Sequence, residues 1–90
     1  MQNIETAMLI DKIKQFPLGY SEVYYQNKKY GVSRSVFNQG KSIKLYVKEL
    51  AGDDFISLNI YSTSTAEILK PCEMPEYKVI DFINNFRPII

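Results

Sequence analysis

Hydrophobic positions near the start of the chain recur at intervals of three and four residues, with polar residues between them. The set comprises Ile4, Met8, Leu9, Ile13 and Phe16. This spacing places the apolar side chains on one side of a helix. Asn3 is a suitable N-cap, and Pro17 and Gly19 end the pattern. The chain therefore predicts an amphipathic helix over residues 4–15.

The period of the pattern then changes from 3.6 to 2, which is typical of strands. Four segments show it, namely "YSEVYYQ", "KYGVSRSVF", "SIKLYVKEL" and "FISLNIYS". Short polar stretches such as "NQG" and "AGDD" connect them. Short connections favour antiparallel neighbours. The sequence therefore predicts a four-stranded antiparallel meander.

The third and fourth segments alternate most clearly between apolar and polar positions. One face is predicted to be buried, and it carries Ile43, Leu45, Val47, Ile56, Leu58 and Ile60. The second segment is ambiguous, because Arg34 shares its parity with Tyr30, Val32 and Val36. A bulge near Gly31, or an edge position for this strand, would resolve the conflict.

A second helix is expected near the end of the chain. Pro75 suits its first turn and Pro88 ends it, while "EILKP" before it is a candidate for a short extended piece. Its apolar stripe comprises Val79, Ile80, Phe82, Ile83 and Phe86. Two amphipathic helices need an apolar surface, and the sheet offers one. We therefore predict a single α+β domain over residues 1–90, in the order α-β-β-β-β-α, with both helices packed on one sheet face.

Composition narrows the chemistry that is available. The 90 residues include no histidine, which removes the commonest metal ligand and general base, and we expect no metal or cofactor. The single cysteine, Cys72, cannot form an internal disulfide, so a reducing compartment fits. The first residues lack a secretion signal, and no apolar run approaches the roughly 20 residues that span a bilayer. We expect a cytoplasmic protein that does not contact membranes.

Charge is distributed unevenly, although the formal net charge is only +1. Residues 23–48 contain six basic residues and no acid, which leaves the rest of the chain with a net charge of −5. Two of these bases, Lys44 and Lys48, fall on the sheet face opposite the apolar one. The candidate binding residues there are Lys44, Tyr46, Lys48, Phe55, Asn59 and Tyr61.

Three interpretations of this face remain open. Cations and aromatic rings on one side of a sheet can simply be solvated, with cross-strand aromatic pairs. Exposed aromatic residues also mark contacts with another protein or with a second copy of the chain. The same residue types bind single-stranded nucleic acid by stacking and phosphate contacts.

Gly40, Lys41 and Ser42 form the tripeptide Gly-Lys-Ser, which ends a phosphate-binding loop in many proteins. Such a loop needs an earlier glycine, where this chain has Ser35, and a helix after the motif. A predicted strand follows instead. We interpret the stretch as a hairpin turn in which Gly40 supplies a positive φ angle.

Cys72 and the nearby acids are the remaining candidates for chemistry. A lone thiol without histidine is most often a buried structural residue. Asp53 and Asp54 fit a turn, and Glu73 and Glu76 fit the start of a helix, where the dipole favours acids.

The stretches "GKSIKLY", "DFISLN" and "LKPCEMP" resemble a family of small bacterial proteins of unassigned function. Some members are labelled peptide methionine sulfoxide reductase. If this chain shared that activity, Cys72 would be its nucleophile and Glu73 or Glu76 its proton donor. The chain departs from the known reductases, because it has no Trp, no Gly-Cys pair and no CxxC motif.

The residues favour binding over catalysis. We expect a small non-catalytic binding or interaction domain that uses the open sheet face, with a protein partner or self-association. The alternatives are a thiol-dependent, reductase-like enzyme that uses Cys72, and single-stranded nucleic-acid binding.

Overall fold

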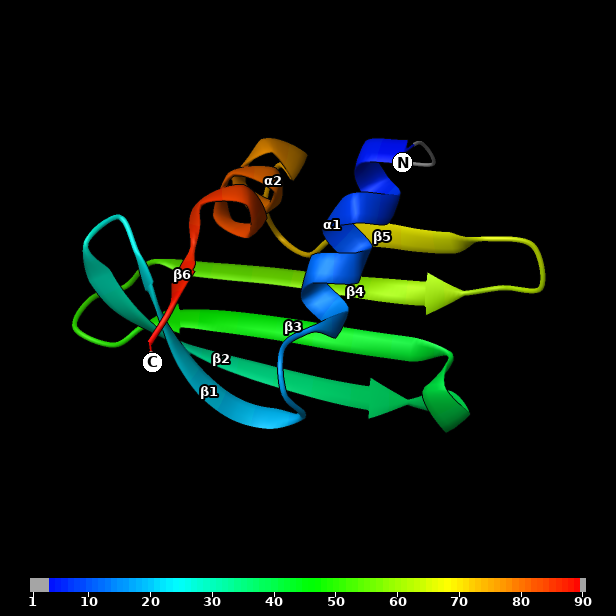
Figure 1. Ribbon diagram of the computed structural model, residues 1–90, viewed down its shortest axis with the longest axis horizontal. Coiled ribbons are helices and arrows are strands. Elements are labelled where there is room, and N and C mark those ends of the chain that lie inside the picture. Colours follow the sequence, from blue (N-terminus) through cyan, green and yellow to red (C-terminus); the bar gives the residue numbers. More distant parts are fainter. Residues whose placement is uncertain (1–3, 90) are drawn as a thin grey trace.

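The computed structural model describes residues 4–89 and has the α+β architecture that the sequence predicts (Figure 1). Within these residues the chain forms two α-helices and one antiparallel sheet. In order, its elements are α1 (Ile4–Lys14), β1 (Gly19–Tyr25), β2 (Lys28–Phe37), the short 3-10 turn η1 (Asn38–Gly40), β3 (Ser42–Glu49), β4 (Phe55–Ser62), β5 (Glu67–Pro71), α2 (Glu76–Asn85) and β6 (Arg87–Pro88). The predicted cap Asn3 and the side chain of Ile4 lie outside what the structure describes. Neither described helix has the length and apolarity needed to cross a membrane.

In the described part of the chain the sheet has six strands, so the prediction of four was incomplete. Its order is β5-β4-β3-β2-β1-β6, and every neighbouring pair is antiparallel. β5 extends the meander by five residues, in the segment that the sequence marked as extended. β6 has only two residues, which pair with β1 through Val23–Pro88 and Tyr24–Arg87. Two residues are too few to show an alternating pattern, so this strand could not be predicted from the sequence.

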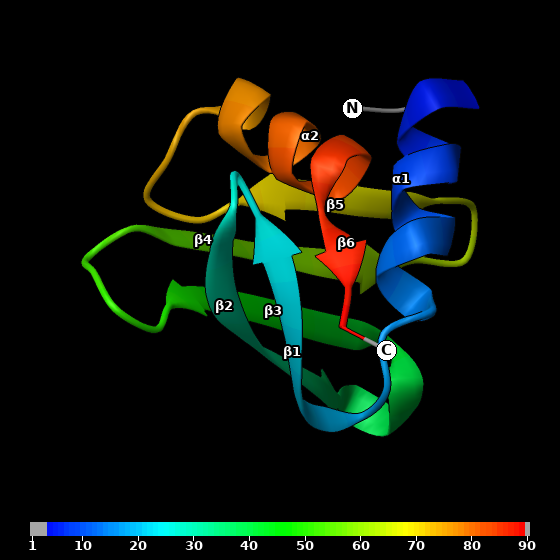
Figure 2. The same cartoon turned by 60° about the vertical axis from the view of Figure 1, so that its left-hand side comes forward.

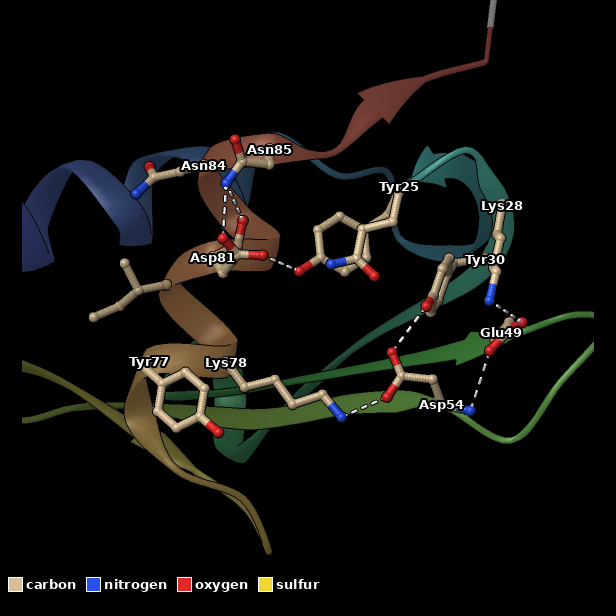
Figure 3. A pocket seen from close by; sticks show the side chains of 12 residues that line it. Tyr25, Lys28, Tyr30, Glu49, Asp54, Tyr77, Lys78, Asp81, Asn84 and Asn85 are labelled. Carbon is tan, nitrogen blue, oxygen red and sulfur yellow. Dashed lines mark hydrogen bonds and ion pairs between the residues drawn. The ribbon is translucent and has the colours of Figure 1, made fainter.

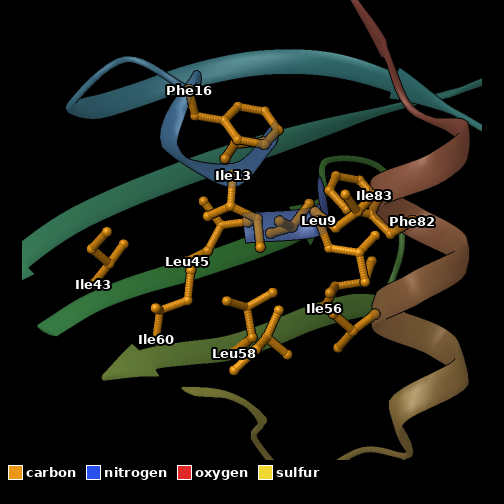
Figure 4. Close-up of a cluster of buried hydrophobic side chains, with 14 of the residues drawn as sticks. Leu9, Ile13, Phe16, Ile43, Leu45, Ile56, Leu58, Ile60, Phe82 and Ile83 are labelled. Atoms are coloured by element: carbon orange, nitrogen blue, oxygen red, sulfur yellow. The ribbon is translucent and has the colours of Figure 1, made fainter. Parts of the chain in front are cut away.

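Both helices lie on the same side of the sheet, and the β1–β2 hairpin curls toward α2 (Figures 1 and 2). We call this side the inner face. Leu45, Leu58 and Ile60 on the sheet have no exposed surface, nor do Ile13 of α1 and Phe82 of α2. These side chains meet in one hydrophobic cluster (Figure 4). The predicted burial of the inner face is therefore confirmed.

The stripe of α1 differs from the predicted one. Met8 is 59% exposed, whereas Ile10 is buried beside Leu9. Both spacings are compatible with a helix, and the position of α1 over the sheet decides which residue faces inward.

Arg34 needs neither a bulge nor an edge strand. The pairing of β2 with β1 and β3 continues without a break, and β2 lies inside the sheet. Arg34 is a half-buried inner-face residue whose Nη1 donates to the carbonyl oxygen of Phe16, 3.4 Å away. That carbonyl lies just beyond the end of α1, where carbonyl groups lack helical partners and carry partial negative charge. The end of the helix therefore accommodates the charge.

Candidate functional site

The sheet side opposite the helices, which we call the outer face, holds all six residues that the sequence proposed for binding. Lys44, Tyr46 and Lys48 lie on β3, which is separated from the edge strand β5 by β4. Cross-strand pairing places them opposite Asn59, Ser57 and Phe55, respectively. Tyr61 lies two residues beyond Asn59 on β4 and is 42% exposed. The structure therefore brings the six residues onto one surface.

Further charged residues on the outer face were not proposed from the sequence. Register places Lys29 of β2, Lys70 of β5 and Glu22 of β1 on this side. The outer positions of β1 to β5 thus carry four lysines and one acid, a formal charge of +3 in a chain whose net charge is +1. The remaining surface is accordingly net negative. Positive charge is therefore concentrated on the outer face of the sheet, in addition to being concentrated in the middle of the chain.

Tyr20 of β1 is a further outer-face residue that sequence reasoning missed. A Cβ atom at Gly31 would lie 2.6–3.0 Å from the hydroxyl and two ring atoms of Tyr20, so the tyrosine ring occupies the space that a side chain would fill. Tyr20 is nevertheless 60% exposed. Its hydroxyl donates to Glu22 at 2.9 Å, and this bond raises the pKa of Tyr20. The ring rests against the sheet with much of its surface open to solvent.

Tyr46 and Phe55 form an aromatic pair near the middle of the outer face. Their ring centroids are 6.1 Å apart and the ring planes differ by 29°. Lys78 of α2 also contacts this pair, with its Nζ over the Phe55 ring and 5.7 Å from the ring centre. The pairing holds Tyr46 in a defined orientation while 39% of its surface stays exposed.

A polar cavity of about 840 Å³ lies elsewhere, between α2, the β1–β2 hairpin and the β3–β4 loop (Figure 3). Two buried tyrosines donate hydrogen bonds into it. Tyr25 donates to Asp81, and Tyr30 donates to Asp54 at 2.8 Å. Lys78 forms an ion pair with the second oxygen of Asp54. These bonds join α2 to the sheet and to the loop before β4.

The cavity groups have shifted pKa values that fit these contacts. Burial, followed by the hydrogen bonds to Asp81 and Asp54, raises the pKa of both Tyr25 and Tyr30. Burial alone would raise the pKa of Asp54, but the hydrogen bonds from Lys78 and Tyr30 and the charge of Lys78 lower it overall. The tyrosines therefore remain neutral donors and Asp54 remains an ionised acceptor at neutral pH.

The acceptors of this cavity already have partners within the protein. Both oxygens of Asp54 are engaged as described, and Asp81 also accepts from the side-chain amide of Asn85 at 3.1 Å. Buried Glu49 accepts from the backbone N–H of Asp54 and pairs with Lys28 at 3.7 Å. Within residues 4–89, no group of three or more His, Cys, Asp or Glu side chains is placed to hold a metal ion. We interpret the network as a structural clamp on α2.

The clamp predicts that stability depends on pH through Asp54. Because the pKa of Asp54 is lower in the folded state, its contribution is present above the ordinary pKa of about 3.9 and is lost as pH falls through the folded value. At pH 7, Asp54→Asn should lower the free energy of unfolding by about 1 kcal/mol, through weaker hydrogen bonds to Lys78 and Tyr30. At about pH 3, below the ordinary pKa, the difference from the wild type should be smaller than at pH 7. Urea unfolding followed by circular dichroism measures both values.

Asp53→Asn is the matched control, because Asp53 lies in the same turn and is exposed. It should change the free energy of unfolding by no more than about 0.5 kcal/mol at either pH. A loss for Asp54→Asn that is equally large at both pH values, or equally large in the control, would contradict the clamp.

The residues considered for thiol chemistry lie apart from both features. Cys72 is half-buried just after β5, and its backbone N–H donates to the carbonyl oxygen of Ser57 at 2.9 Å. Glu73 follows in a turn with φ of 63°, and Glu76 is in the first turn of α2; both are exposed. Cys72 does not line the polar cavity described above.

The stretch that contains Gly40 is a turn, as predicted. Gly40 has φ of +90° and ends the connection η1 between β2 and β3. Ser42 begins β3, so a strand and not a helix follows the motif. The geometry of a phosphate-binding loop is therefore absent at this motif.

Comparisons with known proteins leave the function to be argued from this geometry. No protein-family model, no curated protein and no solved structure matches the chain.

Proposed function

We propose that the protein is a non-catalytic binding domain whose outer face contacts an anionic partner. One observation carries the proposal: four lysines and several exposed aromatic rings share a sheet surface with a single acid, while both helices lie on the other side. Exposed aromatic groups on a soluble domain mark interaction surfaces. An excess of lysines attracts partners of opposite charge.

Charge also argues against pairing of two outer faces. A two-fold symmetric contact sets the same patch of each copy against the other. Two outer faces, each of formal charge +3, would then place lysines of one copy near lysines of the other. Repulsion between like charges makes such a contact unfavourable at close range. A partner with an acidic or phosphorylated surface is the better match.

A thiol-dependent activity receives less support. Cys72 lies beside Ser57 at the end of β5, and the acids that could serve it, Glu73 and Glu76, are exposed to solvent. The described contacts of Cys72 include no base that would favour a thiolate.

The proposal is tested by titrating the isotopically labelled protein with two anionic probes, poly-L-glutamate and oligothymidylate, while recording amide NMR spectra. At least one probe should shift the amide signals of β2, β3 and β4 more than those of α1 and α2. The shifts should shrink as salt is raised, because exposed charges are screened.

Lys44→Glu should weaken this response, because it removes one outer-face cation and adds an acid. Lys12→Glu is the control, since it makes the same charge change on α1, where Lys12 contacts Asn84. The proposal fails if neither probe shifts any signal, or if the shifted residues cluster on the helices.

A further inference from the structure

We infer that the anionic partner is single-stranded nucleic acid, whose bases stack on the outer-face tyrosines while its phosphates pair with the flanking lysines. This inference rests on the proposed function and names its partner. Three features of the outer face support it: the open ring of Tyr20, a row of alternating aromatic and small residues, and the placement of lysines on both sides of that row.

The first feature is the seating of Tyr20 on Gly31. A side chain at position 31 would meet the tyrosine at 2.6 Å, so glycine is what lets the ring approach the backbone. The ring is braced by the bond from its hydroxyl to Glu22 and remains 60% exposed. A base can stack on a ring held in this way at little cost in side-chain entropy, and stacking tolerates any base because each has a π-face.

The second feature is a cross-strand row that runs over four strands. Register places Tyr20 opposite Ser33, Ser33 opposite Tyr46, and Tyr46 opposite Ser57. Two exposed tyrosines are therefore separated by one small residue. Strand spacing puts their Cα atoms about 10 Å apart, and the Tyr20 ring leans from this position toward Gly31. Sheets that bind single-stranded RNA present two or three stacking aromatics in a comparable way.

The third feature is that lysines bracket this row. Lys44 and Lys48 lie two residues to either side of Tyr46 on β3, about 7 Å along the strand. Lys70 extends the Lys44 row, because Asn59 pairs with both lysines. Lys44 and Lys70 are exposed, whereas Lys48 is half-buried and its Nζ donates to the carbonyl oxygen of Gly52 at 2.5 Å. An ammonium group has three N–H donors, so Lys48 keeps two for a phosphate. A nucleic-acid strand whose bases lie on the tyrosine row would carry its phosphates within reach of these ammonium groups.

The composition of the face distinguishes nucleic acid from an acidic protein. Cores of protein interfaces are enriched in aromatic residues but depleted of lysine. Here the lysines are adjacent to the aromatic rings, and the positions between them are small or polar, as in Ser33, Ser57 and Asn59. Cations interleaved with open rings suit a ligand that alternates phosphates with flat bases.

The test is fluorescence anisotropy of the full chain with labelled single strands of about 15 nucleotides, oligothymidylate and oligouridylate. We expect binding that weakens as salt rises from about 50 to 200 mM, with a log–log slope of about −3 if four lysines contact phosphates. Lys44→Glu combined with Lys70→Glu should weaken binding at least about tenfold and lower the slope by about 1.4. Lys12→Glu should bind as the wild type does.

A second variant tests stacking without changing charge. Gly31→Val places a side chain where the Tyr20 ring now rests, so the ring must move away. Oligothymidylate should then bind about 5- to 100-fold more weakly, as expected for the loss of one stacking contact, with an unchanged salt slope. Circular dichroism spectra that match the wild type would confirm that Gly31→Val and the Lys44→Glu, Lys70→Glu double variant are folded.

Binding of poly-L-glutamate, measured in parallel, distinguishes failure of this inference from failure of the proposed function. If poly-L-glutamate binds the outer face and the oligonucleotides do not bind at low salt, the partner is an acidic protein and the inference is wrong, while the proposed function stands. If neither binds, both are wrong. Oligonucleotide binding that Gly31→Val and the lysine variant leave unchanged would also overturn the inference.

Discussion

Leu58→Asp is expected to unfold the protein, whereas Asn59→Asp is expected to leave it folded. Leu58 has no exposed surface and lies in the centre of the inner face, between β3 and β5. An aspartate there would be a buried carboxylate with no cation beside it, at a cost of several kcal/mol. A domain of this size has a total stability of about 5–15 kcal/mol, so most of it would be lost.

Asn59 is the sharpest control for this prediction, because it is the next residue on the same strand and faces the opposite side. An aspartate at position 59 would lie between Lys44 and Lys70 and should change the free energy of unfolding by about 0.5 kcal/mol or less. Thermal unfolding followed by circular dichroism compares the two variants with the wild type. A folded Leu58→Asp protein, or an unfolded Asn59→Asp protein, would contradict the assignment of inner and outer faces.

Phe82→Ala is expected to lower the free energy of unfolding by about 3–5 kcal/mol, as large core truncations do. Phe82 of α2 has no exposed surface, and its ring packs against Tyr25 of the β1–β2 hairpin. Its ring centroid lies 5.1 Å from that of Tyr25 and 5.4 Å from that of Phe86. Removing the ring leaves a cavity between the helix and the curled part of the sheet.

Tyr77→Ala is the matched control on the same helix, because Tyr77 is 74% exposed. It removes a similar aromatic ring and should cost no more than about 0.5 kcal/mol. Urea unfolding at neutral pH measures both changes. If the two variants lost the same stability, α2 would not be anchored through Phe82.

The central part of the fold was predictable because its signal is local. Residues 43–47 and 56–60 alternate without exception between apolar and polar or exposed positions, so their facing followed from the period of a strand. The amphipathic pattern of α2 similarly placed Val79, Phe82 and Ile83 toward the sheet. A pattern of this kind indicates which side of an element is buried, and the structure confirms the predicted burial of these residues.

The missed elements depend on contacts between distant parts of the chain. β6 exists because Arg87 and Pro88 meet β1, which no neighbouring residue indicates. The choice of Ile10 over Met8 depends on how α1 is placed on the sheet. The clamp behaves in the same way, since Tyr25 and Asp81 are 56 residues apart and Asp54 and Lys78 are 24 apart.

The outer face was predictable only for β3 and β4. Lys44 to Lys48 and Phe55 to Tyr61 were found from their own alternation. Tyr20 and Lys70 join them through the registers of β1 with β2 and of β4 with β5. Alternation assigns a residue to a side of its own strand, but neighbouring strands must be aligned before residues can be assigned to one surface.

The pairing of β6 with β1 has a consequence for folding kinetics. Strands β1 to β5 form from neighbouring segments, whereas Val23 and Pro88 must meet across 65 residues. The entropy of closing a long loop makes such contacts late events, after the hairpins are established. Substitutions that weaken the β1–β6 contact should therefore accelerate unfolding while leaving the rate of refolding almost unchanged.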